Sequence, residues 1–117
     1  MGILSGHDLV LDALDGVSAR LVLQNVCARL GIPLVHGAVE GWFGQVTTVF
    51  PGDNTLNRLY PGGGSGSFPG TLSFAPGLIA SVQAAEGTKL LLGREPALRG
   101  QVLYADLLAG RFDILPV

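Results

Sequence analysis

The stretch that decides the fold is residues 8–14, which read Asp8-Leu9-Val10-Leu11-Asp12-Ala13-Leu14. A short apolar run bounded by acidic residues is typical of a parallel strand that is buried on both faces of a sheet. Asp12 and Asp15 fall at the carboxyl end of this expected strand. In open α/β sheets, ligands bind beyond the carboxyl ends of the strands. We therefore predict a buried strand over residues 8–14 with a polar site at its end.

A helix and a second strand follow directly. Apolar residues recur at helical spacing, namely at Ala19, Val22, Leu23, Val26 and Leu30. Because Gly31 then stands where a helix would stop, we predict a helix over residues 17–30. Residues 33–39 form a second apolar run, and one helix separates it from the first strand. This spacing predicts a parallel βαβ crossover.

Three more strands complete the expected sheet. Residues 43–50 are rich in β-branched side chains and follow the second strand after a very short turn, so we expect antiparallel pairing. Residues 101–107 and 111–115 are separated by Leu108-Ala109-Gly110, a pattern that predicts a terminal hairpin. The expected sheet is therefore mixed, and the fold class is α/β.

The segment between the third strand and the hairpin divides into a loop and a helix. Residues 51–76 are rich in glycine and proline, show no period and include Gly62-Gly63-Gly64-Ser65-Gly66-Ser67, which predicts a long flexible loop. A helix should then run from Pro76-Gly77 to about Leu90. Its polar side is expected to carry Gln83, Glu86 and Lys89.

Composition limits the partners and the compartment. The chain has 117 residues, a length that predicts a single domain over 1–117. Of these residues 48% are hydrophobic and 14% are charged, a composition that favours a surface for a partner. Nine acidic and seven basic residues are spread along the chain, which argues against nucleic acid. Glycines and prolines interrupt the uncharged run 59–85, which argues against a membrane span. Without a recognisable secretory signal, we expect a cytoplasmic protein.

Residues 7–16, with Arg20 after them, resemble the strand of the ThiF/MoeB/HesA family that ends in Asp-x-x-Asp-Asn and is followed by an arginine. The resemblance continues in order through Gly31-Ile32-Pro33-Leu34-Val35, Gly44-Gln45-Val46, Gln83-Ala84-x-Glu86-x-x-Lys89-Leu90-Leu91, Asp106 and Arg111-Phe112. It covers nearly the whole chain but only the second half of the family's domain. It implies a partial Rossmann-like ThiF/MoeB fold, with a βαβ unit, a long Gly/Pro-rich loop, a second helix and a C-terminal β-hairpin.

The resemblance also implies a reaction. Members of this family use ATP to adenylate a terminal carboxylate, usually the Gly-Gly end of a ubiquitin-like sulfur-carrier protein, and they commonly form homodimers. Asp15 matches the magnesium-binding aspartate, and carboxylate oxygen is a ligand that Mg²⁺ prefers. Asp12 would support the turn, and Arg20 would bind a phosphate or an acidic neighbour. The candidate catalytic residues are thus Asp15 and Arg20, and the candidate cofactor-binding residues are Asp12, Asp15 and Arg20.

Ordinary structural roles remain open for several of these residues. Asp15 could instead be a helix cap or a solvated acid. The two histidines, His7 and His36, lack ligand companions at metal-binding spacing and are expected to be structural. Trp42 and Phe43 could pack in the core or form an exposed contact for a partner.

The sequence departs from the family pattern in ways that limit the expected chemistry. Gly16 replaces the usual asparagine, and Leu56 and Leu59 occupy the positions of a Cys-x-x-Cys zinc motif, so no zinc is expected there. Cys27, the only cysteine, falls mid-helix, where a small buried hydrophobe is the common role. No glycine-rich nucleotide loop precedes His7.

Two functions therefore compete. The chain could be a fragment or truncated homologue of an adenylyltransferase that is inactive alone, with a partner chain supplying the amino-terminal half. Alternatively, it could be a non-enzymatic dimerisation or protein-binding module built on the same scaffold. The expected oligomer, a homodimer or a complex with that partner chain, agrees with the apolar composition.

Overall fold

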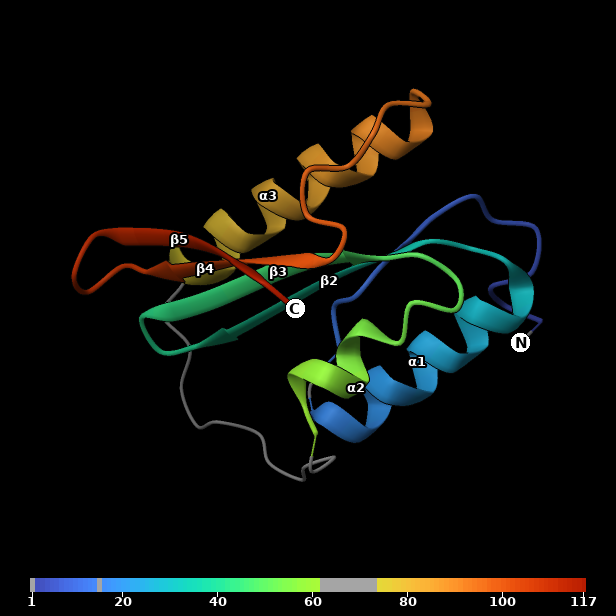
Figure 1. The fold of residues 1–117 in the computed structure, drawn as a ribbon, viewed down its shortest axis with the longest axis horizontal. Coiled ribbons are helices and arrows are strands. Elements are labelled where there is room, and N and C mark those ends of the chain that lie inside the picture. Colours follow the sequence, from blue (N-terminus) through green and yellow to red (C-terminus); the bar gives the residue numbers. More distant parts are fainter. Residues whose placement is uncertain (1, 15, 62–73) are drawn as a thin grey trace.

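The computed structural model describes residues 2–14, 16–61 and 74–117, which fold into a mixed sheet between two layers of helices. The strands are β1 (Val10–Leu11), β2 (Leu34–Glu40), β3 (Phe43–Val49), β4 (Gln101–Asp106) and β5 (Arg111–Pro116), and they lie in the order β1-β2-β3-β4-β5. Helices α1 (Val17–Leu30) and α2 (Thr55–Leu59) cover one face, and α3 (Phe74–Leu91) covers the other (Figure 1). The expected α/β class with a mixed sheet is confirmed.

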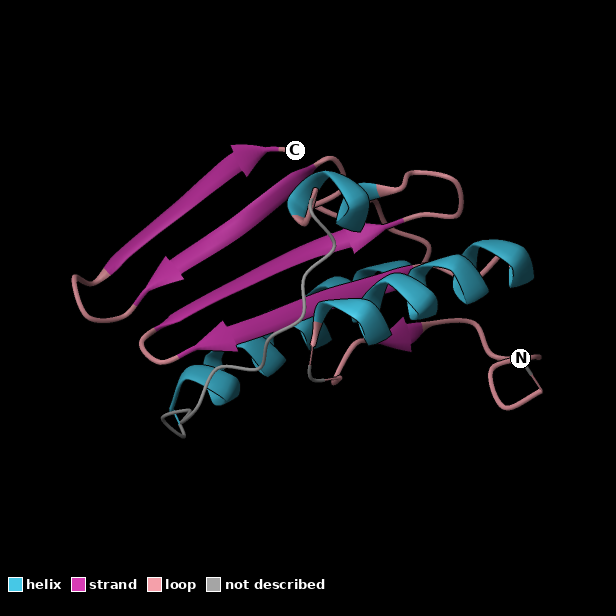
Figure 2. Ribbon diagram, turned by 90° about the horizontal axis from the view of Figure 1, so that it is seen from below, coloured by secondary structure: helices cyan, strands magenta, loops and turns pink. Residues whose placement is uncertain are grey.

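The βαβ unit forms as predicted. Strands β1 and β2 pair in parallel, with Val10 opposite Leu34, while the β2–β3, β3–β4 and β4–β5 pairs are antiparallel. Helix α1 has the predicted bounds and ends because Gly31 adopts the left-handed conformation at φ 71°. The Ile32 N–H then donates to the Cys27 carbonyl at 2.9 Å. Figure 2 shows α1 lying along the strands on one face of the sheet, near the edge that β1 forms.

The first strand is shorter and more exposed than expected. The prediction of a strand over residues 8–14 buried on both faces was wrong, since β1 contains only Val10 and Leu11, and Leu11 is 46% exposed. In the described chain β1 pairs with β2 alone and forms the edge of the sheet. The chain leaves the ladder at Asp12, whose carboxylate accepts the N–H of Leu14.

Each face of the sheet has its own core. On the α1 side the buried residues are Cys27, Leu34, Val49 and Leu56, and on the α3 side they are Val35, Val46, Ile79 and Leu98. Two glycines let α3 approach the sheet closely. A Cβ atom at Gly37 would lie 2.4 Å from Cδ of Gln83, and one at Gly44 would lie 2.5 Å from Cγ1 of Ile79. The absence of a Cβ at these two glycines therefore allows α3 to pack at this distance from the sheet.

A short helix occupies part of the expected loop over residues 51–76. The prediction of a loop throughout this segment was wrong for α2, and residues 62–73 lie outside the described ranges. Gln24 of α1 explains why α2 forms. Its side-chain oxygen accepts the Leu56 N–H at 2.8 Å, and its amide nitrogen donates to Oδ1 of Asn57 at 2.6 Å. These bonds satisfy backbone and side-chain groups that a five-residue helix cannot satisfy itself.

Helix α3 begins at Phe74 and ends at Leu91, close to its expected bounds. Of the residues predicted on its polar side, Lys89 is 39% exposed, but the prediction was wrong for the other two. Gln83 and Glu86 are buried against the sheet and the following connection. The Gln83 amide nitrogen donates to the carbonyls of Asp12 and Val35, each at 3.0 Å. Oε2 of Glu86 accepts the Ala97 N–H at 3.1 Å. The Gln83 side chain satisfies two buried carbonyls and the Glu86 carboxylate accepts a partly buried N–H, roles that helical periodicity does not reveal.

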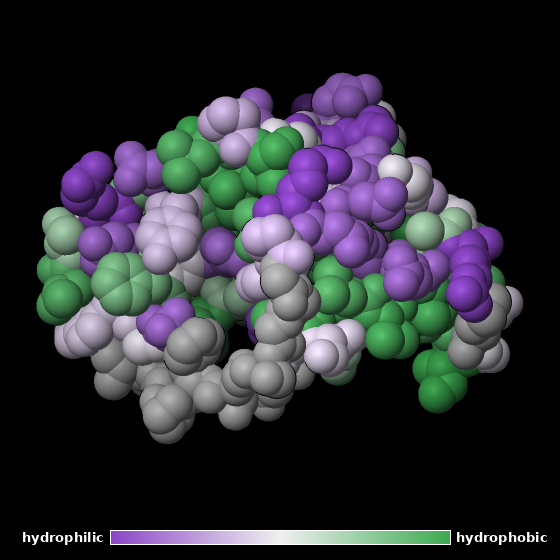
Figure 3. Space-filling view, turned by 60° about the horizontal axis from the view of Figure 1, so that its bottom comes forward, coloured by the Kyte–Doolittle hydropathy of each residue, from purple (hydrophilic) through white to green (hydrophobic). Residues whose placement is uncertain are grey.

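The predicted terminal hairpin is confirmed in β4 and β5. Large apolar side chains are exposed on β5 and its turn, namely Leu108, Phe112, Ile114 and Leu115. Figure 3 shows further apolar side chains (green) among polar ones (purple) on the face that carries α1 and α2. None of the helices in the described ranges has the length and apolar character needed to cross a membrane.

Candidate functional site

The candidate site lies where the chain leaves β1. Leu11 pairs with Val35, so Asp12, one residue further, falls beside His36 of β2 on the face that carries α1. The Asp12 N–H continues the ladder for one step by donating to the Val35 carbonyl at 2.9 Å. Asp12 is 2% exposed and His36 is fully buried. The strand register thus brings two ionisable groups together inside the protein.

Both oxygens of the Asp12 carboxylate are engaged within the chain. Oδ1 accepts the Leu14 N–H at 2.9 Å. Oδ2 lies 2.6 Å from Nδ1 of His36 and 3.3 Å from Nε of Arg20. Buried charge is costly unless it is paired and hydrogen-bonded, and these three partners meet that requirement. The Asp12 carboxylate therefore stabilises the turn that follows it, through the Leu14 N–H.

Arg20 reaches the same turn from the first part of α1. Its terminal nitrogen donates to the Leu14 carbonyl at 2.6 Å, and its side chain is only 13% exposed. The predicted pair Asp12 and Arg20 is thus brought together as an ion pair. Asp15, the residue predicted to bind magnesium, lies outside the described ranges.

His36 connects this pair to α2 and β3. Because a carboxylate only accepts, Nδ1 carries the proton that is shared with Asp12, and a neutral imidazole then offers Nε2 as an acceptor. The Tyr60 hydroxyl lies 3.1 Å from that nitrogen, and the two rings meet edge to face. The amide nitrogen of Gln45 donates to the Tyr60 oxygen at 2.7 Å. Hydrogen bonds therefore run in one direction from Gln45 through Tyr60 and His36 to Asp12.

Burial controls the protonation of this network. Loss of hydration lowers the pKa of His36 from its ordinary 6.5, against the raising effect of the Asp12 hydrogen bond. Burial likewise raises the pKa of the Tyr60 hydroxyl, and the Arg20 charge opposes this rise. Both effects favour the neutral imidazole and the neutral phenol at physiological pH. The hydrogen-bond direction described above is therefore the one expected there.

Sequence reasoning missed three members of the network, His36, Tyr60 and Gln45. His36 had been expected to be an ordinary structural histidine. The available signal was a polar residue inside the apolar run 33–39. His7, by contrast, is exposed near the amino terminus, with Nδ1 3.2 Å from the Leu4 carbonyl.

Metal ligands do not gather in the described part of the chain, where no group of three or more His, Cys, Asp or Glu side chains is placed to hold an ion. Leu56 and Leu59, at the zinc-motif positions, instead pack into the core on the α1 side. Cys27 is also buried in that core, and burial raises the pKa of its thiol.

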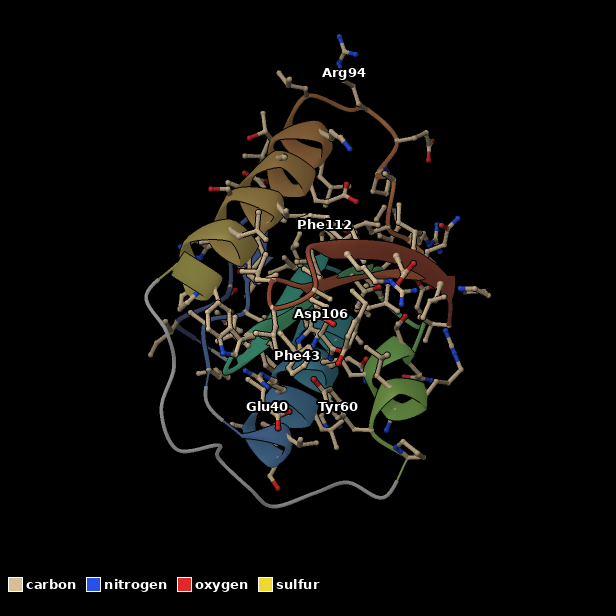
Figure 4. All side chains as sticks on the ribbon, turned by 90° about the vertical axis from the view of Figure 1, so that its left-hand side faces the viewer. Glu40, Phe43, Tyr60, Arg94, Asp106 and Phe112 are labelled. Carbon is tan, nitrogen blue, oxygen red and sulfur yellow. The ribbon has the colours of Figure 1, made fainter. Side chains whose placement is uncertain are left out.

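Aromatic side chains of β3 and β4 lie on the same face of the sheet as Gln45, which pairs with Tyr104. Phe43 is partly buried and its ring centroid lies 6.3 Å from that of Tyr104, which is 39% exposed. Trp42, at the β2–β3 turn, is 40% exposed, so it is not a core residue. Figure 4 shows Glu40 and Tyr60 on the α1 side and Phe112 on the α3 side. The buried network therefore ends beside an aromatic surface.

Comparisons with known proteins identify related sequences along nearly the whole chain. The ThiF family profile matches residues 2–117. The SAMP-activating enzyme E1 of Haloferax volcanii is 38% identical over 120 residues, covering 97% of this chain and 44% of that protein. The adenylyltransferase and sulfurtransferase MOCS3 of Xenopus laevis is 31% identical over 124 residues, covering 94% of this chain and 26% of that protein. The chain therefore spans less than half the length of these relatives.

Two solved structures share the fold. PaaA superposes with a TM-score of 0.66 at 13% identity, covering 98% of this chain and 44% of that one. Escherichia coli MccB, crystallised with AMPCPP and MccA, superposes with a TM-score of 0.69 at 13% identity, covering 93% of this chain and 36% of that one. At this identity the likeness concerns the fold alone. It confirms the expected partial Rossmann-like architecture.

Proposed function

Because the chain belongs to the ThiF family, we propose that it forms the carboxyl-terminal half of an ATP-dependent adenylating domain that activates the terminal carboxylate of a ubiquitin-like sulfur carrier. The relatives named for SAMP activation and for adenylyl transfer support the reaction class. The observation that carries the proposal is the clamped turn after β1, in which Asp12 and Arg20 hold Leu14 directly before Asp15.

The proposed chemistry requires a fixed geometry at that turn. A carboxylate oxygen of the carrier would attack the α-phosphorus of ATP, the bond to the β-phosphate would break, and pyrophosphate would leave. Magnesium supplies charge neutralisation on the phosphates when it is bound. Asp15 is the residue we propose to hold it. Since both Asp12 oxygens already have partners in the chain, Asp12 contributes through the turn and not as a direct ligand.

Arg20 has a corresponding double role in this proposal. Its guanidinium carries a permanent charge and several donors, so it can hold the turn and contribute positive potential to the phosphate region together. Its ion pair with Asp12 keeps that charge at the carboxyl end of β1. This is the end at which ligands bind in open α/β sheets.

The proposed partner is the carrier, and the second expected contact is a homodimer or a chain that supplies the glycine-rich half. Phe43 and Tyr104 offer an aromatic surface next to the network. Aromatic side chains that are partly exposed are enriched at protein interfaces. These residues are therefore the first positions at which to seek carrier binding.

A chimaera tests the proposal directly. In the Haloferax volcanii SAMP-activating enzyme, the segment that this chain matches would be replaced by the 117 residues, and ATP–pyrophosphate exchange would be measured with SAMP present. We expect exchange above background in the chimaera and none in the isolated chain. Asp15→Ala should abolish it, while Asp8→Ala, at the start of the same segment, should leave it intact.

Three outcomes would each count against a part of the proposal. A chimaera that is folded by circular dichroism but does not exchange would favour a dimerisation or binding module without catalysis. Magnesium-dependent exchange that persists after Asp15→Ala would remove the metal role of that residue. A light-scattering mass equal to one chain would contradict the expected oligomer.

A further inference from the structure

We propose that His36 is a positioning residue for the adenylation site, because it fixes the Asp12 carboxylate that holds the turn leading to residue 15. This inference rests on the proposed function, which gives the turn its role in adenylation. The contacts that His36 makes can be tested separately. Neither His36 nor Tyr60 belongs to the sequence pattern that identified Asp12, Asp15 and Arg20.

The partners of the two Asp12 oxygens differ in distance and in hydrogen-bond geometry. Oδ1 receives the Leu14 N–H at 2.9 Å. Oδ2 has the His36 Nδ1 atom at 2.6 Å and the Arg20 Nε atom at 3.3 Å, and the Nε atom lacks hydrogen-bonding geometry to any described partner. Hydrogen bonds with one ionised partner are shorter and about twice as strong as neutral ones. The imidazole is therefore the tight anchor of Oδ2.

The orientation of this carboxylate controls both polar groups of Leu14. If Oδ2 were released, the carboxylate could rotate about its terminal torsion, where energy wells are broad. Oδ1 would then lose its fixed position against the Leu14 N–H. Arg20, which donates to the Leu14 carbonyl at 2.6 Å, would lose its nearby counter-charge as well. One imidazole thus stabilises a turn that it does not contact directly.

Tyr60 and Gln45 keep the His36 proton on the correct nitrogen. Gln45 donates to the Tyr60 oxygen at 2.7 Å, which leaves the Tyr60 O–H to donate to Nε2 at 3.1 Å, and the Gln45 amide nitrogen itself lies 3.3 Å from Nε2. With Nε2 acting as an acceptor, the ring proton remains on Nδ1 and is available to Asp12. A tautomer is set by the hydrogen bond that the other ring nitrogen makes. The proton position on His36 therefore depends on groups from β3 and from the residue after α2.

A matched pair of amide variants separates positioning from simple filling of space. In His36→Asn the side-chain nitrogen can lie near the place of Nδ1, whereas in His36→Gln it extends toward the place of Nε2. Hydrogen exchange at the Leu14 amide would be followed by NMR on the full 117-residue chain. We expect His36→Gln to lower Leu14 protection about tenfold, as for a lost charge-assisted hydrogen bond, and His36→Asn to retain most of it.

The unsubstituted imidazole gives a second readout that does not depend on how the variants fold. Its ¹⁵N shifts should show a proton on Nδ1 and none on Nε2, and loss of both donors that face Nε2, in Tyr60→Phe combined with Gln45→Leu, should shift the ring toward a mixture of tautomers. A proton on Nε2 in the unsubstituted chain would overturn the inference. So would equal Leu14 protection in the unsubstituted chain and both His36 variants.

The chimaera separates this inference from the proposed function. Removal of a group that orients a ligand typically costs 10–100-fold in activity, so we expect His36→Gln to lower the exchange kcat by about that factor and His36→Asn to restore much of it. If the unsubstituted chimaera does not exchange, the proposed function fails and Leu14 protection still decides the role of His36. If His36→Gln exchanges at the unsubstituted rate, the positioning role fails and the proposed function stands.

Discussion

Nδ1 of His36 lies 2.6 Å from Oδ2 of Asp12, although 24 residues separate them in the chain. Parallel pairing of β1 and β2 produces this contact, since Leu11 opposite Val35 leaves the next residue of each strand on the same face. Helix α1, which connects the two strands, supplies Arg20 to the same carboxylate. The βαβ unit thus contributes the carboxylate of Asp12, the guanidinium of Arg20 and the imidazole of His36.

Asp12→Asn should destabilise the protein by about 2 kcal/mol, because a hydrogen bond to a charged group contributes roughly 1.5–3 kcal/mol. The amide would also leave Arg20 without its ion-pair partner. Urea unfolding followed by circular dichroism measures the change. Asp106→Asn is the matched control, because Oδ1 of Asp106 also accepts a turn N–H, from Ala109 at 3.0 Å, in an exposed hairpin. Equal losses in the two variants would contradict a special role for the buried carboxylate.

Stability should depend on pH through His36. Burial lowers its folded pKa below the ordinary 6.5, so between these two values the unfolded chain binds more protons than the folded one. The contribution is therefore complete above pH 6.5 and decreases as pH falls toward the folded pKa, with a slope of up to about 1.4 kcal/mol per pH unit. Unfolding free energies from pH 5 to 7.5 test this. His36→Asn should flatten the profile, and an unchanged slope would contradict the assignment.

The pH dependence of stability that comes from Asp53 should fall in a separate, more acidic range. The hydrogen bonds from Arg99 hold the pKa of the Asp53 carboxyl below its ordinary 3.8. This contribution is present above pH 3.8 and is lost as pH falls through the lower folded value. Because the pair is on the surface, its effect should be below about 1 kcal/mol. Asp53→Asn should therefore lower the unfolding free energy by that small amount between pH 5 and 7.5, and urea unfolding should show the difference from the unsubstituted protein shrinking as pH falls below 3.8.

Gly37→Ala should cost about 1–3 kcal/mol, the usual range for an overpacked core. The added Cβ would lie 2.4 Å from Cδ of Gln83, whose amide is held by two backbone carbonyls. Gly77→Ala is the control, since its Cβ would meet no described atom within 4 Å on α3. That variant should be neutral or stabilised by up to about 1 kcal/mol. A stable Gly37→Ala protein would show that α3 does not depend on this close approach.

Arg20→Lys should lower the exchange activity of the chimaera about 10–100-fold, the scale seen when orienting partners of a site are removed. Lysine keeps the charge but cannot reproduce the fork that reaches both Asp12 and Leu14. Arg29→Lys, at an exposed position in the last turn of α1, is the control. Exchange kinetics at varied ATP concentration measure the effect, and equal kinetics for Arg20→Lys and the unsubstituted chimaera would refute the role of the fork.

Local patterns predicted those parts of the fold that local interactions determine. Apolar spacing and Gly31 defined α1, and the two β-rich segments after residue 100 defined the hairpin. Helix α2 could not be predicted because five residues carry no period and their stability depends on Gln24. Gln83 and Glu86 were predicted on the polar side because a helical wheel contains no information about the carbonyls of Asp12 and Val35 or about the Ala97 N–H after α3.

The candidate site divides in the same way. Asp12 and Arg20 were found through a motif within one short segment. His36, Tyr60 and Gln45 come from three other elements, and their meeting depends on strand register and on the position of α2. A polar residue inside an apolar strand was the available sign for His36, but its partner could be identified only from the pairing of β1 with β2.

The two hydrogen bonds from Gln83 also determine when the site can form during folding. They join α3 to the carbonyls of Asp12 and Val35, contacts that span 71 and 48 residues of sequence. Closing such long loops costs entropy before any contact compensates for it, so distant contacts form late. On the ribosome, the hydrogen bonds from Gln83 to the end of β1 cannot form until α3 has emerged. Although β1 precedes the other strands in chain order, its end should therefore be among the last parts of the sheet to reach native geometry.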